Sequence, residues 1–291
     1  MSVWSELRLL LKVARPGFWS TAIWFYLLPL GGSTAWQQPE FWLGLVYVTL
    51  PLGLVIYGWN DLADRETDQL NPRKDTYLFG ARATTAELRR LPMWIAGVQV
   101  PFVWAFLLII GPKVIGWCAL LATATAIYNL PRVGFKNWPG VDMLNQVGYL
   151  LVFVLSSWLN HVPQLPLATF AFGALFAMHS HLFGQIMDHA PDLASGRRTT
   201  AGVLGLQRAK WFMVALLTAE ALLVWKGAGD LWIAAFLTGG ALFFVADVML
   251  LWKNRVYSPG EMRFFFLAWN AVALLSIPWV WSTARLAGKG I

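Results

Sequence analysis

Long apolar runs separated by short polar stretches dominate this chain. Each run has about 17 to 23 residues, which is long enough to cross the hydrocarbon core of a bilayer as a helix. The run that precedes Gly111 and the run that follows it are best explained by a tight turn at that glycine. The pattern predicts an all-α, polytopic membrane protein, with residues 1–291 forming a single domain. We read nine spans, at 18–36, 41–59, 93–111, 114–130, 143–161, 165–186, 210–226, 230–252 and 263–283.

The N-terminal stretch differs from these runs because charged residues alternate with leucines up to Arg15-Pro16. No small-residue cleavage site follows a short apolar core, so a cleavable signal is not expected. Residues 1–15 instead predict an amphipathic helix in the membrane interface, with its helical part at 3–14. We expect Trp4, Leu7, Leu10 and Leu11 on the lipid side, with Glu6, Arg8 and Lys12 towards water.

The positions of Lys and Arg support this topology. Alternating spans place 18 of the 22 Lys and Arg residues on one side, and this side is expected to be cytoplasmic. The N-terminus and the main acidic clusters lie on the same side, so we expect an integral protein of a bacterial or archaeal cell membrane with a cytoplasmic active face. The net charge of +7 then reflects an anionic leaflet. It gives no reason to expect nucleic acid as a partner.

The first acidic cluster follows the second apolar run directly, at residues 60 to 68. On a continuous helix, Asp61, Asp64 and Asp68 fall within an arc of roughly 60°, which Asn60 widens to about 100°. Glu66 would point elsewhere. Three like charges on one face repel one another unless a cation lies among them, and ligand sets of oxygens alone suit Mg2+. The cluster therefore predicts a magnesium site.

A second cluster repeats the pattern in different surroundings. Asp188 and Asp192 are four residues apart after an apolar run, as are Asp64 and Asp68. In both clusters a pair of cations follows after four residues, and together the two form an internal half-repeat. Carboxylates for Mg2+ beside cations for an anion describe a phosphate or diphosphate site. The alternative is that both clusters are solvated helix ends with surface ion pairs. The cation pairs are Arg73-Lys74 and Arg197-Arg198.

The loop between the fourth and fifth spans lies on the same side of the membrane. Its Pro and Gly residues predict a short loop that ends at Asp142. Arg132 and Lys136 would add positive charge over a bound diphosphate, and Tyr128 would line the mouth of a pocket. An ordinary positive-inside loop with an interfacial tyrosine explains the same residues equally well.

Polar residues within spans are costly, which makes them candidates for function. Asn145 begins the fifth span just below the expected active face, and His181 lies on the sixth span on the helical face that leads to Asp188. Either a contact with a polar group of the substrate or proton acceptance would suit His181. A buried histidine bonded to a neighbouring helix is as good an explanation. Glu220 and Asp247 lie deeper, and helix-to-helix contacts are the only role we suggest for them.

These motifs resemble a known family. The run from Asn60 to Asp68 resembles the NDxxDxxxD motif of the UbiA-type intramembrane prenyltransferases, and Asp188 to Asp192 resembles their second DxxxD motif. The resemblance covers most of the chain. It implies helices around a central cavity that opens towards lipid, in which the aspartates hold Mg2+ and an isoprenoid diphosphate under a cytoplasmic cap.

Some shorter segments resemble carotenoid-directed members of the lycopene elongase type. One departure lies inside the second motif, where acidic residues are common in the family but this chain has His189-Ala190-Pro191. This departure concerns the ligands of a second metal and leaves both aspartates in place. The segments that carry the likeness are 15–19, 71–74 and the Met178-His179 pair.

The resemblance implies ionisation of an allylic diphosphate, with Asp64, Asp68, Asp188 and Asp192 as catalytic residues. The resulting allylic cation would alkylate a lipophilic acceptor, such as a carotenoid or a quinone precursor, which then loses a proton or is captured by water. Membrane lipids are the other expected partners. The metal ligands would be Asn60, Asp61, Asp64, Asp68, Asp188 and Asp192. The substrate-binding residues would be Arg73, Lys74, Tyr128, Arg132, Lys136, Asn145, His181 and Arg198.

Two alternatives stay open at this stage. A terpene cyclase or diphosphate lyase would carry the same motifs, because the allylic cation would then attack its own chain. A transporter would instead place carboxylates near the middle of the bilayer. The main acidic clusters lie at the ends of spans, which disfavours the transporter.

Overall fold

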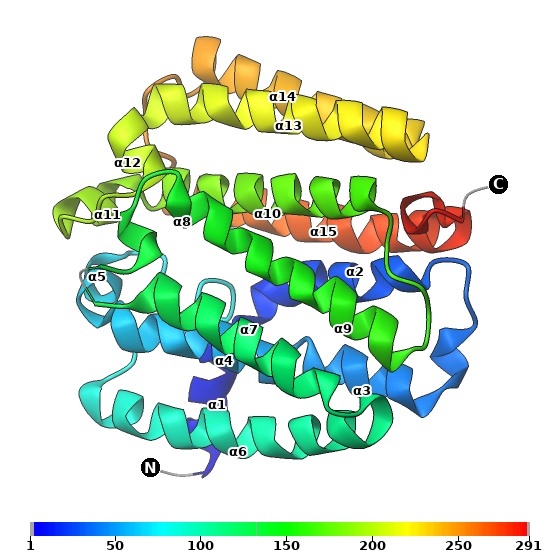
Figure 1. The fold of residues 1–291 in the computed structure, drawn as a ribbon. Helices are drawn as coiled ribbons and strands as arrows, with labels where there is room; N and C mark the ends of the chain where they lie inside the picture. The colour runs from blue at the N-terminus through cyan, green and yellow to red at the C-terminus, as the bar shows by residue number, and fades with distance from the viewer. Residues whose placement is uncertain (1–2, 132, 290–291) are drawn as a thin grey trace.

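A computed structural model describes residues 3–131 and 133–289 of the chain. Those residues form helices and connections, with one isolated bridge between Thr76 and Gly80 and no strand. The α-helices, shown in Figure 1, are α1 (Val3–Val13), α2 (Trp19–Leu27), α3 (Pro39–Tyr47), α4 (Leu50–Ala63), α5 (Arg65–Leu70), α6 (Thr85–Ile110), α7 (Lys113–Asn129), α8 (Val141–Leu144), α9 (Leu151–Leu159), α10 (Leu167–Met187), α11 (His189–Ala194), α12 (Thr200–Leu204), α13 (Leu206–Ala228), α14 (Leu231–Met249) and α15 (Pro259–Thr283).

The long helices confirm the prediction of an all-helical membrane protein. Within the described residues, seven helical segments are long and apolar enough to cross a membrane. The two other predicted spans form shorter helices, so the expected number of nine is approximate. The run at 18–36 contains α2, of nine residues, followed by the 3-10 turn Leu28–Leu30, and the run at 114–130 is α7, of 17 residues.

Glycine and proline set the junctions between neighbouring helices. Helix α6 ends at Ile110, and Gly111 follows with φ of 72°, a left-handed conformation that favours glycine. Pro112 then precedes the first turn of α7. The tight turn predicted between these two spans is therefore present, and it brings α6 and α7 side by side.

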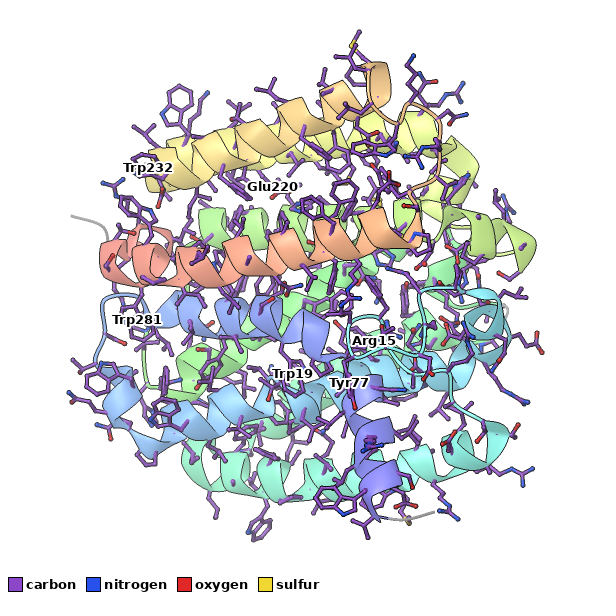
Figure 2. The ribbon with its side chains drawn as sticks, turned by 180° about the vertical axis from the view of Figure 1, so that it is seen from behind. Arg15, Trp19, Tyr77, Glu220, Trp232 and Trp281 are labelled. Carbon is purple, nitrogen blue, oxygen red and sulfur yellow. The ribbon has the colours of Figure 1, made fainter. Side chains whose placement is uncertain are left out.

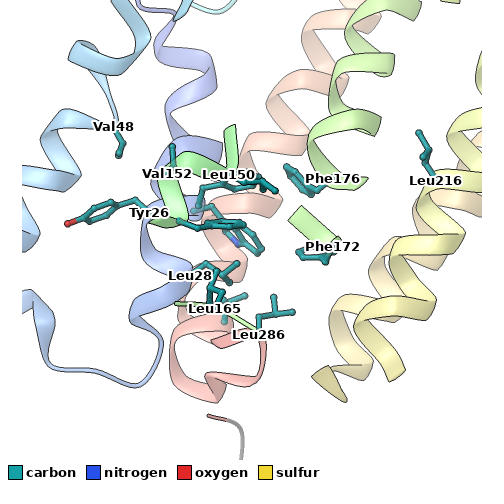
Figure 3. Close-up of a cluster of buried hydrophobic side chains, with 14 of the residues drawn as sticks. Tyr26, Leu28, Val48, Leu150, Val152, Leu165, Phe172, Phe176, Leu216 and Leu286 are labelled. Carbon is teal, nitrogen blue, oxygen red and sulfur yellow. The ribbon is translucent and has the colours of Figure 1, made fainter. Parts of the chain in front are cut away.

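The core lies where α2, α9, α10 and α15 meet. Large aromatic side chains fill it, and the rings of Trp24 and Phe176 stack with centroids 5.9 Å apart. Figure 3 shows Phe172 and Phe176 of α10 on one side of this cluster and Tyr26 of α2 on the other, with its ring pointing away from them. The α13–α14 hairpin packs against α10 on one side of the bundle (Figure 1). Interlocked rings of this size give the membrane helices a close-packed, rigid scaffold.

The polar segments gather at one end of the bundle. Helices α5, α8, α11 and α12 lie together there, and the C-terminus lies at the opposite end (Figure 1). Arg15 lies towards this polar end, whereas Trp232 and Trp281 lie at the other (Figure 2). The two acidic clusters are thus carried to the same end, although more than 100 residues separate them in the sequence.

The N-terminal helix α1 packs on the protein more closely than the amphipathic pattern suggested. Trp4 and Leu7 are exposed, in keeping with an interfacial helix. Leu10, however, is buried in a cluster with Leu54 of α4 and Leu91 of α6. Leu10 therefore contacts other helices and not lipid.

Candidate functional site

Both acidic clusters are built around a break between two helices. Asp64 separates α4 from α5 with φ −104° and ψ 14°, and Asp188 separates α10 from α11 with φ −90° and ψ 7°. This sparsely populated backbone region is common at active sites. The half-repeat of the sequence thus recurs in the backbone. The expectation of one continuous helix through the first cluster is wrong, because the chain bends at Asp64.

Arginine residues connect the two clusters reciprocally. Arg197, which follows the second cluster, places Nη2 2.6 Å from Oδ1 of Asp64 in the first. Arg73, which follows the first cluster, donates from Nε to Oδ1 of Asp188 over 2.6 Å, and its Nη2 also contacts the same carboxylate. Asn71 adds a 2.8 Å hydrogen bond to Asp188. Each cluster therefore supplies the cation that holds the other.

Three further cations complete the network. Lys74 Nζ lies 2.8 Å from Asp68 Oδ2 and 3.0 Å from Asp61 Oδ1, and Arg15 donates to that same Asp61 oxygen over 2.6 Å. Lys136, from the loop after α7, pairs with Asp64. These three cations are far from one another in the sequence, so the site closes only when the fold is complete.

The structure thus places the predicted Arg73, Lys74 and Lys136 against the aspartates. The predicted Arg198 is exposed, whereas its neighbour Arg197 turns inwards and contacts Asp64. Arg132, another predicted substrate ligand, lies outside the described residues. Glu66 is exposed, as its position on the helix predicted.

The charges of this network balance. Five carboxylates, from Asp61, Asp64, Asp68, Asp188 and Asp192, meet five cations, from Arg15, Arg73, Lys74, Lys136 and Arg197. A diphosphate that entered this neutral site would bring several negative charges. Positive charge would have to enter with it, and divalent ions are the usual source.

Burial affects the carboxylates unequally. Burial by itself would raise the pKa of Asp64, but Arg197 and Lys136 outweigh it and hold the pKa below its ordinary value. In contrast, burial raises the pKa of Asp68 to about 6 against the opposing charge of Lys74. Burial likewise raises the pKa of Asp192 to about 7 despite Arg197. At the equivalent positions Asp68 and Asp192, burial thus outweighs the paired cation.

The donor chemistry of the site fits Mg2+. Carboxylate and amide oxygens are the ligands that this ion prefers. Within the described residues Asp61 Oδ2 is buried without a hydrogen-bond partner, so one acceptor is available. Among the described residues, no three His, Cys, Asp or Glu side chains lie close enough together to hold one metal ion. Lys and Arg side chains lie between the carboxylates. An ion at these oxygens would have to take the place of some of these cationic partners.

A cavity of about 150 Å³ lies beneath the network. Asn60 connects the cavity with the network, because its side chain lines the cavity and donates to Asp64 Oδ2 over 2.8 Å. Tyr128, Asn145 and His181 also line this cavity, as the sequence suggested. The other lining residues are Arg15, Ile56, Tyr57, Leu121, Ala124, Thr125, Asn129, Gln146, Gly148 and Tyr149.

Asp142 anchors the segments around the site, a role that the sequence did not indicate. It is fully buried and accepts hydrogen bonds from Thr200 N (2.8 Å) and Gln185 Nε2 (2.7 Å), as well as from the Thr200 hydroxyl. These contacts tie the loop after α7 to α10 and α12. Because that loop carries Lys136 and α12 follows Arg197, Asp142 fixes both cations indirectly.

The deeper carboxylates take no part in this site. His179 Nδ1 lies 2.5 Å from Glu220 Oε1, between α10 and α13. Figure 2 shows Glu220 in the layer between the α13–α14 hairpin and the rest of the bundle. Lys210 lies 2.8 Å from Asp247, between α13 and α14. Glu220 and Asp247 are therefore the helix-to-helix contacts that we suggested from the sequence.

Comparison with known sequences gives one family. The profile of the UbiA prenyltransferase family matches residues 18–272. A lycopene elongase/hydratase from Corynebacterium glutamicum is 29% identical over 256 residues, which cover 85% of this chain and 86% of that protein. A lycopene elongase/hydratase from Halobacterium salinarum is 33% identical over 212 residues, covering 69% and 73% respectively.

Comparison with solved structures gives the same fold. A UbiA homologue from Archaeoglobus fulgidus, bound to DMAPP and Mg2+, superimposes with a TM-score of 0.71 at 20% identity and covers 94% of this chain and 98% of that one. The same homologue bound to GPP and Mg2+ gives a TM-score of 0.68 at 18% identity, with 93% and 98% coverage. At this level of identity the structures share their fold.

Proposed function

The chain belongs to the UbiA prenyltransferase family, and on that premise we propose that it transfers a prenyl group from an isoprenoid diphosphate to a carotenoid acceptor within the membrane. The observation that carries the proposal is the reciprocal pairing of the two acidic clusters above a cavity. Asp64 binds Arg197 and Asp188 binds Arg73, which supports a single ligand shared by both clusters. A single anionic group between them would meet carboxylates and cations from both.

Magnesium is the cofactor that this arrangement supports. Asn60, Asp61, Asp64, Asp68, Asp188 and Asp192 would hold it, and when bound it would neutralise charge on the departing diphosphate. The raised pKa values of Asp68 and Asp192, caused by burial, support a need for added positive charge at these two positions. The homologue structures from Archaeoglobus fulgidus were solved with this ion.

The chain's own cations would bind the phosphate oxygens. Arg73, Lys74, Lys136 and Arg197 contact carboxylates of the two clusters, and a diphosphate bound between the clusters would accept hydrogen bonds from them. Guanidinium groups suit this role because their fork of donors matches phosphate and carboxylate alike. Charge that develops on the leaving group would then be stabilised by groups already in place.

The cavity would hold the reacting end of the hydrocarbon. Tyr57 and Tyr149 line it with their hydroxyls 3.4 Å apart, and the Arg15 guanidinium lies 4.7 Å from the centroid of the Tyr57 ring. Aromatic faces attract an allylic cation through the ring quadrupole, as they do any cation. A lycopene-like acceptor is favoured because relatives that cover most of this chain carry that activity in their names.

The test is to identify the lipid product. Purified protein in lipid vesicles that contain lycopene would be given geranylgeranyl, farnesyl or dimethylallyl diphosphate with Mg2+, and the lipids analysed by mass. We expect one donor to increase the mass of lycopene by its prenyl group, with or without one added water. A cyclised hydrocarbon formed from the donor alone would favour a terpene cyclase, and an unchanged acceptor with every donor would contradict the carotenoid assignment.

A further inference from the structure

Prenyl transfer to an alkene leaves a carbocation on the acceptor, and a base must then take a proton from it. We propose that His181 is this base and that Tyr128 orients its ring. The inference rests on the proposed function and adds to it the residue that ends the reaction. It is carried by the lining of the cavity beneath the aspartate network.

The cavity contains a single candidate base among the described residues. Its lining includes no Asp or Glu, one Arg, several amides and hydroxyls, and one imidazole, that of His181. Amides and hydroxyls are very weak bases near neutral pH, whereas imidazole accepts a proton readily. The carboxylates of the network lie above the cavity and are engaged by Lys and Arg. His181 is therefore the group with a basic lone pair where the hydrocarbon would react.

A contact with Tyr128 holds this imidazole in position. His181 Nε2 lies 3.3 Å from the Tyr128 hydroxyl, and the two rings meet edge to face with centroids 5.9 Å apart. Tyr128 belongs to α7 and His181 to α10, so their contact joins two helices that line the cavity. In the neutral tautomer that donates from Nε2 to the Tyr128 oxygen, the lone pair of Nδ1 is left to accept a proton. A proton that arrives at Nδ1 leaves this hydrogen bond in place and moves neither ring.

The second histidine of this helix sharpens the assignment. His179 is two residues earlier on α10, which turns it by about 200° to a different face. It is buried against Glu220 of α13 and does not line the cavity. Only His181 of this pair is placed to meet substrate.

The step balances with groups already named. The C–O bond of the allylic diphosphate breaks and its electron pair leaves with the diphosphate. A π pair of the acceptor forms the new C–C bond and leaves a cation on the neighbouring carbon. His181 Nδ1 then takes a proton from the adjacent carbon, and the C–H pair becomes the new C=C bond. Where no base acts, water captures the cation and the product carries a hydroxyl group.

The experiment compares product ratios for the His181→Gln and Tyr128→Phe variants with wild type. For each protein the alkene product, the hydroxylated product and the diphosphate are quantified in lipid vesicles with donor, polyene acceptor and Mg2+. We expect His181→Gln to lower the alkene formed per diphosphate released by about 100-fold, the low end of what a positioned base contributes. The hydroxylated product should become a larger share of the total product. Tyr128→Phe should shift the ratio of alkene to hydroxylated product in the same direction, but by less.

A control and a second variant keep the test decisive. His161 lies in the loop before α10, outside the cavity lining, so His161→Asn should leave the ratio unchanged. In His181→Ala, added imidazole should restore the alkene share. An unchanged ratio in His181→Gln, with both products falling together, would overturn the proposal and leave the departing diphosphate as the base. Wild-type protein that releases no diphosphate would instead contradict the proposed function itself.

Discussion

Arg197 Nη2 lies 2.6 Å from Asp64 Oδ1, so the segment after the second acidic cluster is held at the centre of the first. Arg73 makes the corresponding contact with Asp188, in the opposite direction. Neither cluster is closed by its own arginine alone. Two segments that resemble each other in sequence have therefore become one site, and its ligand is expected to meet both.

The exchange of cations follows from this pairing. When every group is ionised, the five carboxylates of the network balance its five cations, and a buried carboxylate that lost its partner would be strongly disfavoured. Metal and diphosphate can enter together at little electrostatic cost, because each supplies the partner that the other displaces. Either one alone would leave buried charges unpaired.

Replacing Asp64 with Asn should abolish turnover. The change removes the carboxylate that two cations hold, and we expect activity to fall by at least about 100-fold. Glu66→Gln is the matched control, since Glu66 lies in the same motif with its side chain exposed. Initial rates of diphosphate release measure both variants, and near-normal activity of Asp64→Asn would refute its place in the site.

The two adjacent arginines after the second cluster should differ sharply. Arg197→Gln removes contacts to Asp64 and Asp192, so we expect turnover to fall by about 100-fold. Arg198 is exposed, and Arg198→Gln should change turnover by no more than about twofold. Equal losses in the two variants, measured in the same vesicles, would contradict the orientation described here.

Asp142 should matter for both stability and diphosphate binding. Asp142→Ala leaves the Thr200 N–H and the Gln185 amide without their acceptor, at a cost of about 1–3 kcal/mol for each buried group. A lower melting temperature and a higher KM for the diphosphate are expected together, because Lys136 and Arg197 lose their support. Asp142→Asn retains one acceptor and should recover part of both. A change in stability with an unchanged KM would limit Asp142 to folding.

The buried pair of His179 and Glu220 should affect stability and not chemistry. His179→Ala leaves the Glu220 carboxyl without its partner, and we expect the free energy of unfolding to fall by about 1–3 kcal/mol. The double variant His179→Ala/Glu220→Ala should lose less stability than the two single variants added together, because no unpaired carboxyl or imidazole is then left buried. Thermal unfolding in detergent measures the stability. A product ratio altered in His179→Ala would show that this histidine, too, acts on substrate.

The sequence was informative where a pattern depends on neighbours along the chain. Run length predicted the helical membrane fold, and the spacing of Asp64 and Asp68 recurred at Asp188 and Asp192. Cations beside those motifs, such as Lys74, could be predicted, because only a few residues separate them from the aspartates and they must therefore lie close to them. The continuous helix through Asp64 was wrong, since hydrophobic periodicity does not report a bend at its polar end.

The residues that sequence reasoning missed depend on tertiary contacts. Arg15 is 46 positions from Asp61, and only the packing of α1 on α4 brings its guanidinium there. Arg197 rather than Arg198 faces the site because Gly196, with φ of 71°, turns the chain just before it. Asp142 resembled an ordinary loop residue, and its partners on α10 and α12 are brought to it only by the fold. The Arg15-Pro16-Gly17 turn was the one sequence signal that could have pointed to Arg15.

Diphosphate release by the wild-type protein in lipid vesicles tests the central claim most directly. The assay would use geranylgeranyl diphosphate, with and without Mg2+ and with and without a polyene acceptor. The charge balance of the network predicts no release without the ion, and the proposed prenyl transfer predicts none without the acceptor. Release that is undiminished after removal of divalent ions, or the absence of release under every condition, would contradict the account of one metal-dependent prenyl transfer site.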